Sequence, residues 1–301
     1  MTDRASSAAT PQAPGFCRFR IGDLEAIALH DGVLVRDRPA GFIRNAEDQA
    51  VGEAFAAIGL PRDKLSLTFT PLAIRTAAGV VLIDTGFGAG GPPGTGQLLA
   101  NMQAAGIRPQ DVSTVLISHF HGDHISGLRG ADGTPSFANA EVVVPQPEWD
   151  FWMDDARMQA APEGMKPNFA LVRKSFGAGL PGLSRFAWGE QVLPGITAVQ
   201  ANGHTPGMSA FRIESGSAAM MFVADITNNP LIFARHPEWQ AMFDMDPLQA
   251  VTTRKALLDQ AAADRLRLSF FHAPFPATGY ILKNGAGYEF APAMWASPGT
   301  F

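Results

Sequence analysis

The sequence predicts a layered α/β fold. Short apolar runs with the length and alternation of β-strands recur along the chain, and segments with helical spacing lie between several of them. Histidines and aspartates recur directly after these apolar runs. Layered α/β folds place their chemistry at the ends of strands, so the same pattern predicts the architecture and the position of a site.

The first third of the chain contains strand candidates separated by turns. Phe16–Leu29 alternates as a strand should, and Leu67–Ala73 and Val80–Ile83 are further apolar runs of strand length. Residues 48–58 and 97–105 have helical spacing, and each segment is followed by a glycine that stops a helix. The loop FGAGGPPGTG lacks the GK[ST] ending of a phosphate-binding loop, so we expect a flexible connection there.

Six more apolar runs follow in the rest of the chain. They are the strand candidates 112–117, 141–144, 196–200, 208–213, 220–223 and 266–271. A helix is predicted from Pro247 to about Ala263, because Asp246 suits the cap position and proline suits the first turn. The segment 146–190 breaks the alternation and holds three of the five tryptophans. We expect it to be an aromatic-rich insertion in a single domain that spans residues 16–301.

Composition argues against several classes of protein. A net charge of −5 and the absence of any basic run argue against nucleic-acid binding. The single cysteine, Cys17, excludes an intramolecular disulfide and a thiolate cluster. No apolar run has the length of a membrane span, so no membrane partner is expected. Residues 1–15 are expected to be a disordered tail without signal-peptide features, which favours a cytoplasmic protein, or a periplasmic one if a signal has been removed.

The stretch SHFHGDHISG, after the strand candidate 112–117, has the spacing of a metal-binding loop. His119 and His121 are separated by one residue, so in extended backbone they project to the same side. Asp123 and His124 follow a glycine that permits a sharp turn, which lets them swing toward a second point. Four such groups in a row do not make a buried site, so other ligands must come from elsewhere in the chain.

Three more metal-type side chains follow later strand candidates, and they are His204, Asp225 and His272. His204 lies in a turn rich in glycine and proline. Asp225 ends an apolar strand, where burial of a carboxylate without a partner is costly. Together with the first loop they make five histidines and two aspartates, which suffice for two metal ions that share one carboxylate.

These motifs resemble the metallo-β-lactamase superfamily, whose first signature is HxHxDH. HFHGDH is followed here by GHTPG, a strand-end aspartate and a late strand-end histidine, and the resemblance extends from Leu82 to His272. Within the superfamily the chain is most similar to the methyl parathion hydrolase and quorum-quenching lactonase branch, because of NGHTPG, HPEWQAMFDMDP and HAPFP. The resemblance implies an αββα sandwich, that is, two mixed β-sheets flanked by helices, with the site at one edge.

The resemblance also assigns the site residues. It implies that His119, His121 and His204 hold one metal, that Asp123, His124 and His272 hold the other, and that Asp225 bridges them. Asp84 is implied to brace the histidine loop without binding metal. Because the donors are imidazoles and carboxylates, two zinc ions are favoured, with manganese, cobalt or iron(II) as alternatives.

Such a dinuclear site indicates a hydrolase, in which a hydroxide that bridges the metals attacks the substrate. Asp123 and Asp225 are the expected catalytic residues, and by its position Asp123 could pass a proton to the leaving group. No arginine or lysine cluster lies beside the strand-end motifs, so we expect a small neutral lactone or carboxylic ester as substrate, with promiscuous phosphotriesterase activity beside it. The pocket is expected to contain Phe87, Trp152, Phe169, Phe275 and Tyr280.

Other functions stay open at this point. They are a primary organophosphate hydrolase, a β-lactamase, a thioester hydrolase and a metal-binding module without catalysis. The loop FGAGGPPGTG has no aromatic residue after Phe87, which argues against efficient parathion-type hydrolysis. Core packing is the alternative role for the pocket aromatics. The oligomeric state is also open, with a homodimer as one alternative.

Overall fold

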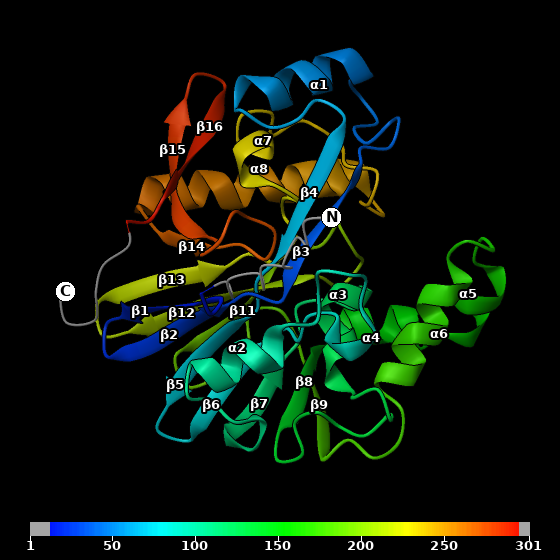
Figure 1. Cartoon of the computed structure of the whole chain (residues 1–301), viewed down its shortest axis with the longest axis vertical. Helices are drawn as coiled ribbons and strands as arrows, with labels where there is room; N and C mark the ends of the chain where they lie inside the picture. The colour runs from blue at the N-terminus through cyan, green and yellow to red at the C-terminus, as the bar shows by residue number, and fades with distance from the viewer. Residues whose placement is uncertain (1–12, 295–301) are drawn as a thin grey trace, which may run out of the picture.

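Two seven-stranded sheets and a separate two-stranded ribbon form the centre of the computed structural model, which describes residues 13–294 (Figure 1). The first sheet contains, in spatial order, β1 (Phe16–Ile21), β2 (Leu24–Leu29), β5 (Leu72–Thr76), β6 (Gly79–Ile83), β7 (Val112–Leu116), β8 (Glu141–Pro145) and β9 (Gly182–Phe186). The second contains β10 (Gln191–Leu193), β11 (Ile196–Gln200), β12 (Ser209–Ser215), β13 (Ala218–Phe222), β14 (Arg267–Ser269), β15 (Thr278–Asn284) and β16 (Gly287–Pro292).

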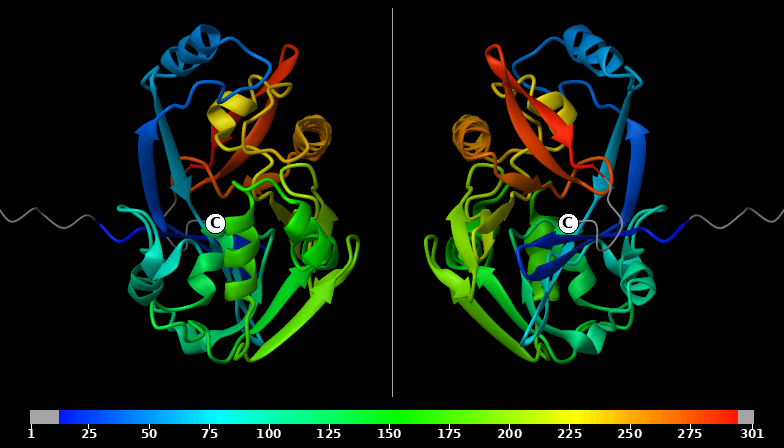
Figure 2. Two further views of the ribbon diagram at one scale, coloured as in Figure 1. Left: turned by 90° about the vertical axis from the view of Figure 1, so that its right-hand side faces the viewer. Right: turned by 90° about the vertical axis from the view of Figure 1, so that its left-hand side faces the viewer.

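The two-stranded ribbon pairs β3 (Gly32–Asp37) with β4 (Lys64–Phe69). It is not hydrogen-bonded into either large sheet. In the side views, β3 and β4 rise together along one side of the molecule toward α1 (Figure 2). This ribbon forms one wall of a cavity.

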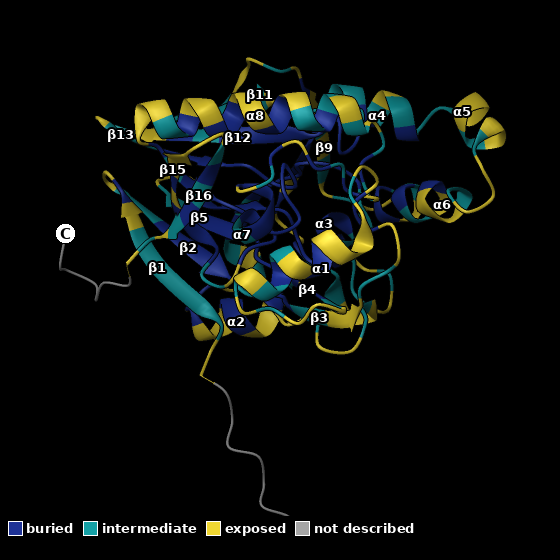
Figure 3. Ribbon diagram, turned by 90° about the horizontal axis from the view of Figure 1, so that it is seen from above, coloured by how far each residue is buried: buried dark blue, intermediate teal, exposed yellow. Residues whose placement is uncertain are grey.

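Helices lie outside the sheets. The α-helices are α1 (Asp48–Ala57), α2 (Leu98–Ala104), α3 (Gly122–Ile125), α4 (Gln146–Trp152), α5 (Asp155–Ala160), α6 (Lys166–Ser175), α7 (Pro230–Phe233) and α8 (Pro247–Asp264). Single 3-10 turns lie at Gly88–Gly90, Pro109–Asp111 and Ser126–Leu128. α2 packs against β1 and β2, α4 against β8 and β9, and α8 against β15, while α5 and α6 extend away to one side (Figures 1 and 3). The predicted αββα sandwich is therefore confirmed.

Alternate residues of one strand face two different cores. In β6, Val81 and Ile83 belong to the core between the sheets, whereas Val80 and Leu82 belong to the outer core together with Met102 of α2. Successive side chains of a strand point to opposite faces, and here both faces are covered. This explains why the strand is a continuous apolar run rather than an alternating one.

The long helix predicted near Asp246 is confirmed, but two predicted strands are each divided in the structure. Asp246 caps α8, since its Oδ1 accepts a hydrogen bond of 3.0 Å from the amide of Gln249. Phe16–Leu29 is the antiparallel pair β1 and β2. The expected strand Leu67–Ala73 is instead the end of β4 and the start of β5, which belong to different sheets. Pro71 lies at the break, where it has no amide hydrogen to offer a ladder.

The aromatic-rich segment is mostly helical, but part of it belongs to the first sheet. The segment 146–190 contains α4, α5 and α6, but it also contains β9, which pairs in parallel with β8 at the edge of the first sheet.

Residues 1–12 of the expected tail lie outside the described residues. Gly15 is described, and its amide donates to Oδ1 of Asn101 at 2.8 Å. Between residues 13 and 294, no helix is long and apolar enough to cross a membrane.

Candidate metal centre

Strand pairing brings four of the predicted site residues to one edge of the sandwich. Asp84 and His119 follow β6 and β7, which pair in parallel, and Asp225 and His272 follow β13 and β14, which also pair in parallel. The carboxyl ends of parallel neighbours lie at the same edge of a sheet. The two sheets therefore present their loops to a common point.

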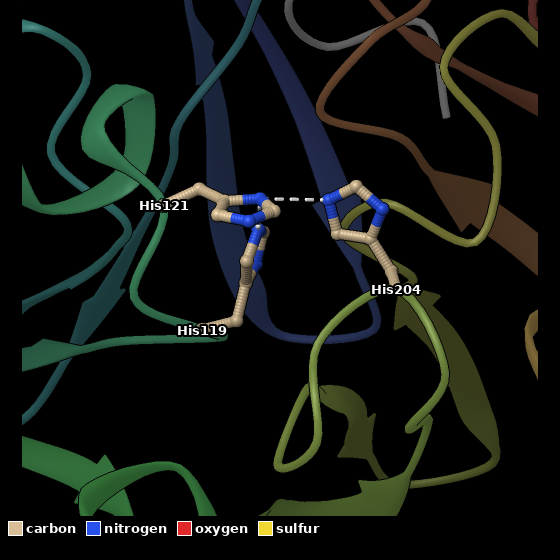
Figure 4. A group of neighbouring side chains, drawn as sticks. All are labelled: His119, His121 and His204. Carbon is tan, nitrogen blue, oxygen red and sulfur yellow. Dashed lines mark hydrogen bonds between the residues drawn. The ribbon is translucent and has the colours of Figure 1, made fainter. Parts of the chain in front are cut away.

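His119, His121 and His204 form the first group of side chains (Figure 4). Nδ1 of His121 lies 3.2 Å from Nε2 of His119 and 2.9 Å from Nε2 of His204. Gly203 lets the backbone pass close to α8, since its φ is +125° and a Cβ there would lie 2.3 Å from the amide nitrogen of Ala250. The loop before β12 can thus carry His204 toward the other two rings.

Asp123, His124, Asp225 and His272 form the second group. Asp225 lies between the two groups: Oδ1 is 3.3 Å from Nε2 of His124, and Oδ2 is 3.0 Å from Nε2 of His272 and 3.3 Å from Nε2 of His204. Asp123 lies on the more open side, with its Oδ2 3.3 Å from Nε2 of His272. All seven predicted ligand residues thus lie together, in two groups that match those implied by the resemblance.

Two buried polar atoms in this cluster lack a hydrogen-bond partner. They are Nε2 of His124 and Oδ1 of Asp225, which lie 3.3 Å apart without the alignment of a hydrogen bond. Leaving such atoms unsatisfied is costly, and a cation between them would satisfy both. Imidazole nitrogens and carboxylate oxygens are suitable donors for zinc and similar divalent ions. The residues present therefore fit two metal ions.

The pKa values of His119 and His121 favour neutral imidazoles. Burial lowers the pKa of His119 well below its usual value, and the neighbouring His124 adds to this effect. Burial likewise lowers the pKa of His121 to about 3, with His204 as the next contributor. Neutral imidazoles have the free lone pair that a metal ion requires.

The second group is governed by its carboxylates. Burial alone would lower the pKa of His272, but the carboxylates of Asp225 and Asp123 outweigh it and raise that pKa to about 10. In the same way, Asp123, Asp225 and Asp84 outweigh burial and raise the pKa of His124 well above its usual value. Burial would raise the pKa values of Asp123 and Asp225, yet the histidines around them hold both well below the usual range. A cation that enters this group therefore displaces protons.

Asp84 lies where the resemblance places it, beneath the histidine loop. It is fully buried, and it accepts hydrogen bonds from the amide of Ser118 at 2.8 Å and from the Ser118 hydroxyl at 2.7 Å. Its Oδ2 also lies 2.8 Å from Nδ1 of His124. A proton on Nδ1 of His124 would leave its Nε2 free for a ligand, so this contact selects the useful tautomer.

The sequence motifs missed two buried carboxylates that support the site. Oδ1 of Asp244 lies 2.9 Å from Nδ1 of His204. Glu148 accepts hydrogen bonds from the amides of Phe120 and Gly207, at 3.0 and 2.7 Å, and so ties together the two loops that carry the first histidine group. Asp244 lies within HPEWQAMFDMDP, a stretch that is similar to the lactonase branch, so the sequence offered a signal for it. No motif marks Glu148.

A cavity of about 580 Å³ opens above the two groups. Its floor contains His121, Asp123, His204, Asp225 and His272, and the β3–β4 ribbon, the start of α6 and the segment 242–245 form its walls. The apolar lining residues are Leu34, Leu67, Phe69, Phe87, Met165, Met242, Phe243 and Met245. Two polar amides, Asn168 and Asn228, also face this space.

Only Phe87 of the five predicted pocket aromatics lines this cavity. Trp152 and Phe169 are fully buried against each other in the outer core, and the Trp152 indole donates to Glu148 at 2.9 Å. Phe275 packs on the edge of the His30 ring. Tyr280 is 40% exposed on β15 and lines a different surface groove. These four side chains do not line the cavity. Trp152 and Phe169 have the alternative role of core packing, and for Phe275 and Tyr280 nearness in sequence to His272 does not determine which way the side chain points.

Two arginines line the cavity that the strand-end motifs did not indicate. Arg36 lies on β3, and Arg44 lies in the loop between β3 and α1. Both are more than 70 residues away in sequence from the first histidine motif. No arginine or lysine cluster lies beside the strand-end motifs in the sequence, but in space these two arginines line the cavity above the site.

A cavity above two adjoining groups of imidazoles and carboxylates, at the edge of an αββα sandwich, defines the class of metal-dependent hydrolases with this fold. The sequence profile described as "Metallo-beta-lactamase superfamily" matches residues 72–272. The chain belongs to the metallo-β-lactamase superfamily.

Solved structures and curated sequences give more specific likenesses. The chain is similar to AidC, a dizinc quorum-quenching lactonase solved with the product N-hexanoyl-L-homoserine; identity is 27%, the TM-score is 0.88, and 94% of this chain and 98% of that one are covered. It is also similar to the hydrolase AbOPH of the beta-lactamase superfamily, with 25% identity, a TM-score of 0.87, and coverage of 95% of this chain and 100% of that one.

Among curated proteins, metallo-beta-lactamase domain-containing protein 1 of Xenopus laevis is 28% identical over 60% of this chain and 62% of its own length. N-acyl homoserine lactonase of Bacillus cereus is 22% identical over 54% of this chain and 65% of its own length. The chain thus spans less than two thirds of the length of these two relatives.

Proposed function

We propose that this chain is a dinuclear metal-dependent hydrolase that opens a neutral lactone or carboxylic ester group. The observation that carries the proposal is the position of Asp225, whose two oxygens reach His124 on one side and His204 and His272 on the other. A carboxylate placed in this way can be shared by two ions. The lactonase named among the structural relatives supports the same class of reaction.

Each group of side chains would hold one ion. His119, His121 and His204 would hold the first, Asp123, His124 and His272 would hold the second, and Asp225 would be common to both. When bound, such ions acidify a water molecule and polarise the carbonyl oxygen of an ester. Zinc fits the donor set, and manganese, cobalt and iron(II) fit it less specifically.

Asp123 is the residue we assign to proton transfer. Its side chain is 18% exposed, against 3% for Asp225, and it lines the cavity. Its pKa lies well below the usual range, so it is ionised at neutral pH. Its position in the cavity, and not a high basicity, is what would let it take up the proton of the attacking water. The same proton can then pass to the alkoxide that leaves, so that water supplies both the hydroxide for the acyl carbon and the proton for the leaving oxygen.

Asn228 is the residue we assign to the carbonyl oxygen of the substrate. It is only 5% exposed, it lines the cavity three residues after Asp225, and its side chain forms no hydrogen bond with any of residues 13–294. Its amide is open to the cavity and therefore available to a ligand. Its N–H can donate to the carbonyl oxygen as negative charge develops there, which is the form of stabilisation that ester hydrolysis needs.

The cavity walls suit an acyl chain or an aryl group. Phe69, Phe87 and Phe243 provide aromatic surface above the polar floor. Apolar pockets discriminate by only about 1–3 kcal/mol per methylene group, so several esters should be accepted. For this reason we propose hydrolysis of aryl phosphotriesters as a side activity.

A substrate panel tests the proposal. Metal-loaded protein is assayed with an N-acyl homoserine lactone, an aryl carboxylic ester, a phosphotriester, a thioester and a β-lactam. We expect the highest kcat/KM for the lactone or the carboxylic ester, lower turnover of the phosphotriester, and loss of all turnover on chelation. The proposal fails if the β-lactam or the thioester is the best substrate, or if chelation leaves ester turnover unchanged.

A further inference from the structure

The mouth of the cavity carries two guanidinium groups that the hydrolytic reaction does not use. Arg36 and Leu34 are two residues apart on β3 and both line the cavity, so they share one face of the ribbon. Arg44 reaches the same cavity from the loop that follows β3. Neither guanidinium belongs to the metal-type groups on the floor.

Arg36 is held by an aromatic ring and not by a carboxylate. Its guanidinium carbon lies 5.6 Å from the centre of the Phe243 ring, which also lines the cavity. Its side chain forms no hydrogen bond or ion pair with the part of the chain between residues 13 and 294. All five of its N–H donors are therefore available to a ligand.

Arg44 is fixed in orientation but keeps donors free. Its Nη2 donates to the carbonyl oxygens of Met242 at 2.7 Å and of Asp244 at 3.1 Å. Its Nε and Nη1 have no acceptor among the described residues. Because two carbonyls anchor the group, little side-chain entropy would be lost when it binds an anion.

The carboxylates that line the cavity do not neutralise these arginines. Asp123, Asp225 and Asp244 are the acidic lining residues, and each lies against a histidine of the floor. Asp244 is also close to the buried Arg254. The chain as a whole has a net charge of −5, so a cationic cavity mouth is a local feature and not a consequence of composition.

We infer that Arg36 and Arg44 form an anion subsite, which binds a carboxylate or a similar oxyanion at the far end of the substrate. Guanidinium groups bind carboxylates through charge-assisted, often bidentate hydrogen bonds. Between this subsite and the floor lie apolar residues such as Leu67 and Phe69. The preferred substrate is therefore an ester or lactone that reacts at a neutral group, continues through an apolar spacer and ends in an anion.

This inference rests on the proposed function for the reacting group, and it changes the expectation that the substrate is neutral as a whole.

A binding experiment can test the anion subsite independently of catalysis. Isothermal titration calorimetry with metal-loaded protein compares linear dicarboxylates of five to ten carbons with the monocarboxylates of the same carbon number. Both series offer one carboxylate to the floor, and only the first offers a second one to the arginines.

We expect at least one dicarboxylate to bind about fivefold more tightly than its matched monocarboxylate, since an exposed ion pair contributes up to about 1 kcal/mol. Arg36→Gln should remove most of this preference, and the double variant R36Q/R44Q should remove all of it. Arg62→Gln is the control, because Arg62 is exposed and does not line the cavity. The preference should also shrink as salt is raised.

Equal affinities for the two series in the wild-type protein, or a preference that survives in R36Q/R44Q, would overturn the subsite. Kinetics separates this failure from failure of the proposed function. If aryl esters of monocarboxylic acids are turned over but half-esters of dicarboxylic acids gain nothing, only the subsite is wrong. If dicarboxylates bind with the expected preference and no ester or lactone is turned over, the subsite stands and the proposed reaction is wrong.

Discussion

The Nδ1 atom of His204 lies 2.9 Å from Oδ1 of Asp244, and both side chains are buried. This carboxylate fixes the ring so that Nε2 faces His121 and Asp225. Oδ2 of Asp244 lies 3.5 Å from Nη2 of Arg254, whose Nη1 also donates to the carbonyl oxygens of Pro237 and Trp239. The position of one predicted metal ligand thus depends on a network that begins in helix α8.

Asp244→Asn should weaken metal binding, because a neutral amide would hold the His204 ring and its tautomer less firmly than the carboxylate does. Removing partners of this kind typically costs 10–100-fold in metal affinity or activity, and we expect about tenfold here. A competition titration against a chelator measures the affinity. Glu238→Gln, an exposed change on the same segment, is the control and should leave the affinity unchanged. Unaltered affinity in Asp244→Asn would show that His204 needs no such support.

Glu148→Gln should destabilise the fold, because this buried carboxylate accepts all of its hydrogen bonds with the described residues. The partners are the amides of Phe120 and Gly207 and the Trp152 indole. An amide side chain has one acceptor oxygen, so one of these donors would face an NH2 group, at a cost of about 1–3 kcal/mol. Denaturant unfolding of the metal-free protein measures this cost. The exposed Glu163→Gln should cost much less, and equal effects would contradict the role of Glu148.

Trp152→Ala should act on stability and not on substrate choice. The side chain is fully buried in the outer core, 6.5 Å from the His121 ring between centroids, and its loss should cost about 3–5 kcal/mol. Phe87→Ala is the comparison, because Phe87 lines the cavity. We expect Phe87→Ala to reduce kcat/KM for bulky esters more than for small ones, and Trp152→Ala to affect both alike. The opposite pattern would show that Trp152, and not Phe87, determines substrate choice.

The stability of the metal-free protein should fall between about pH 6.5 and pH 10. The pKa of His272 is raised from 6.5 to about 10, so the protonated ring stabilises the fold. This contribution is fully present below pH 6.5 and is lost as the pH rises through about 10. Melting curves of chelated protein at pH 6.5, 7.5 and 8.5 measure the slope. Metal-loaded protein should lack this slope, and metal-free His272→Gln should show a smaller one, since the raised pKa of His124 still contributes. A metal-free protein that is equally stable across this range would contradict the pairing with Asp225.

The ligands could be predicted from sequence because each follows a short apolar run. The chain reaches the site through strand ends, and the spacing HxHxDH, the turn around His204 and the strand-end residues Asp225 and His272 are local patterns. Parallel pairing of β6 with β7 and of β13 with β14 then places them together. The two central sheets of the fold contain the same strands.

The cavity walls could not be predicted in this way. Arg36 and Phe243 face each other from β3 and from the segment before α8, about 200 residues apart, and no local pattern connects them. Trp152 and Phe87 are both aromatic residues near a ligand, yet one faces the outer core and the other the cavity. That difference depends on how α4 packs on β8, which periodicity alone does not specify.

Metal content measured against turnover tests the central claim, that one chain holds two ions around Asp225. Elemental analysis of purified, fully active protein should give two divalent metal ions per chain. Asp225→Ala should lose metal and turnover together, since its oxygens adjoin both groups of ligands, whereas His236→Ala, whose ring packs on Trp239 outside the cavity, should keep both. One metal ion or none in fully active protein, or two ions and full turnover in Asp225→Ala, would contradict the claim.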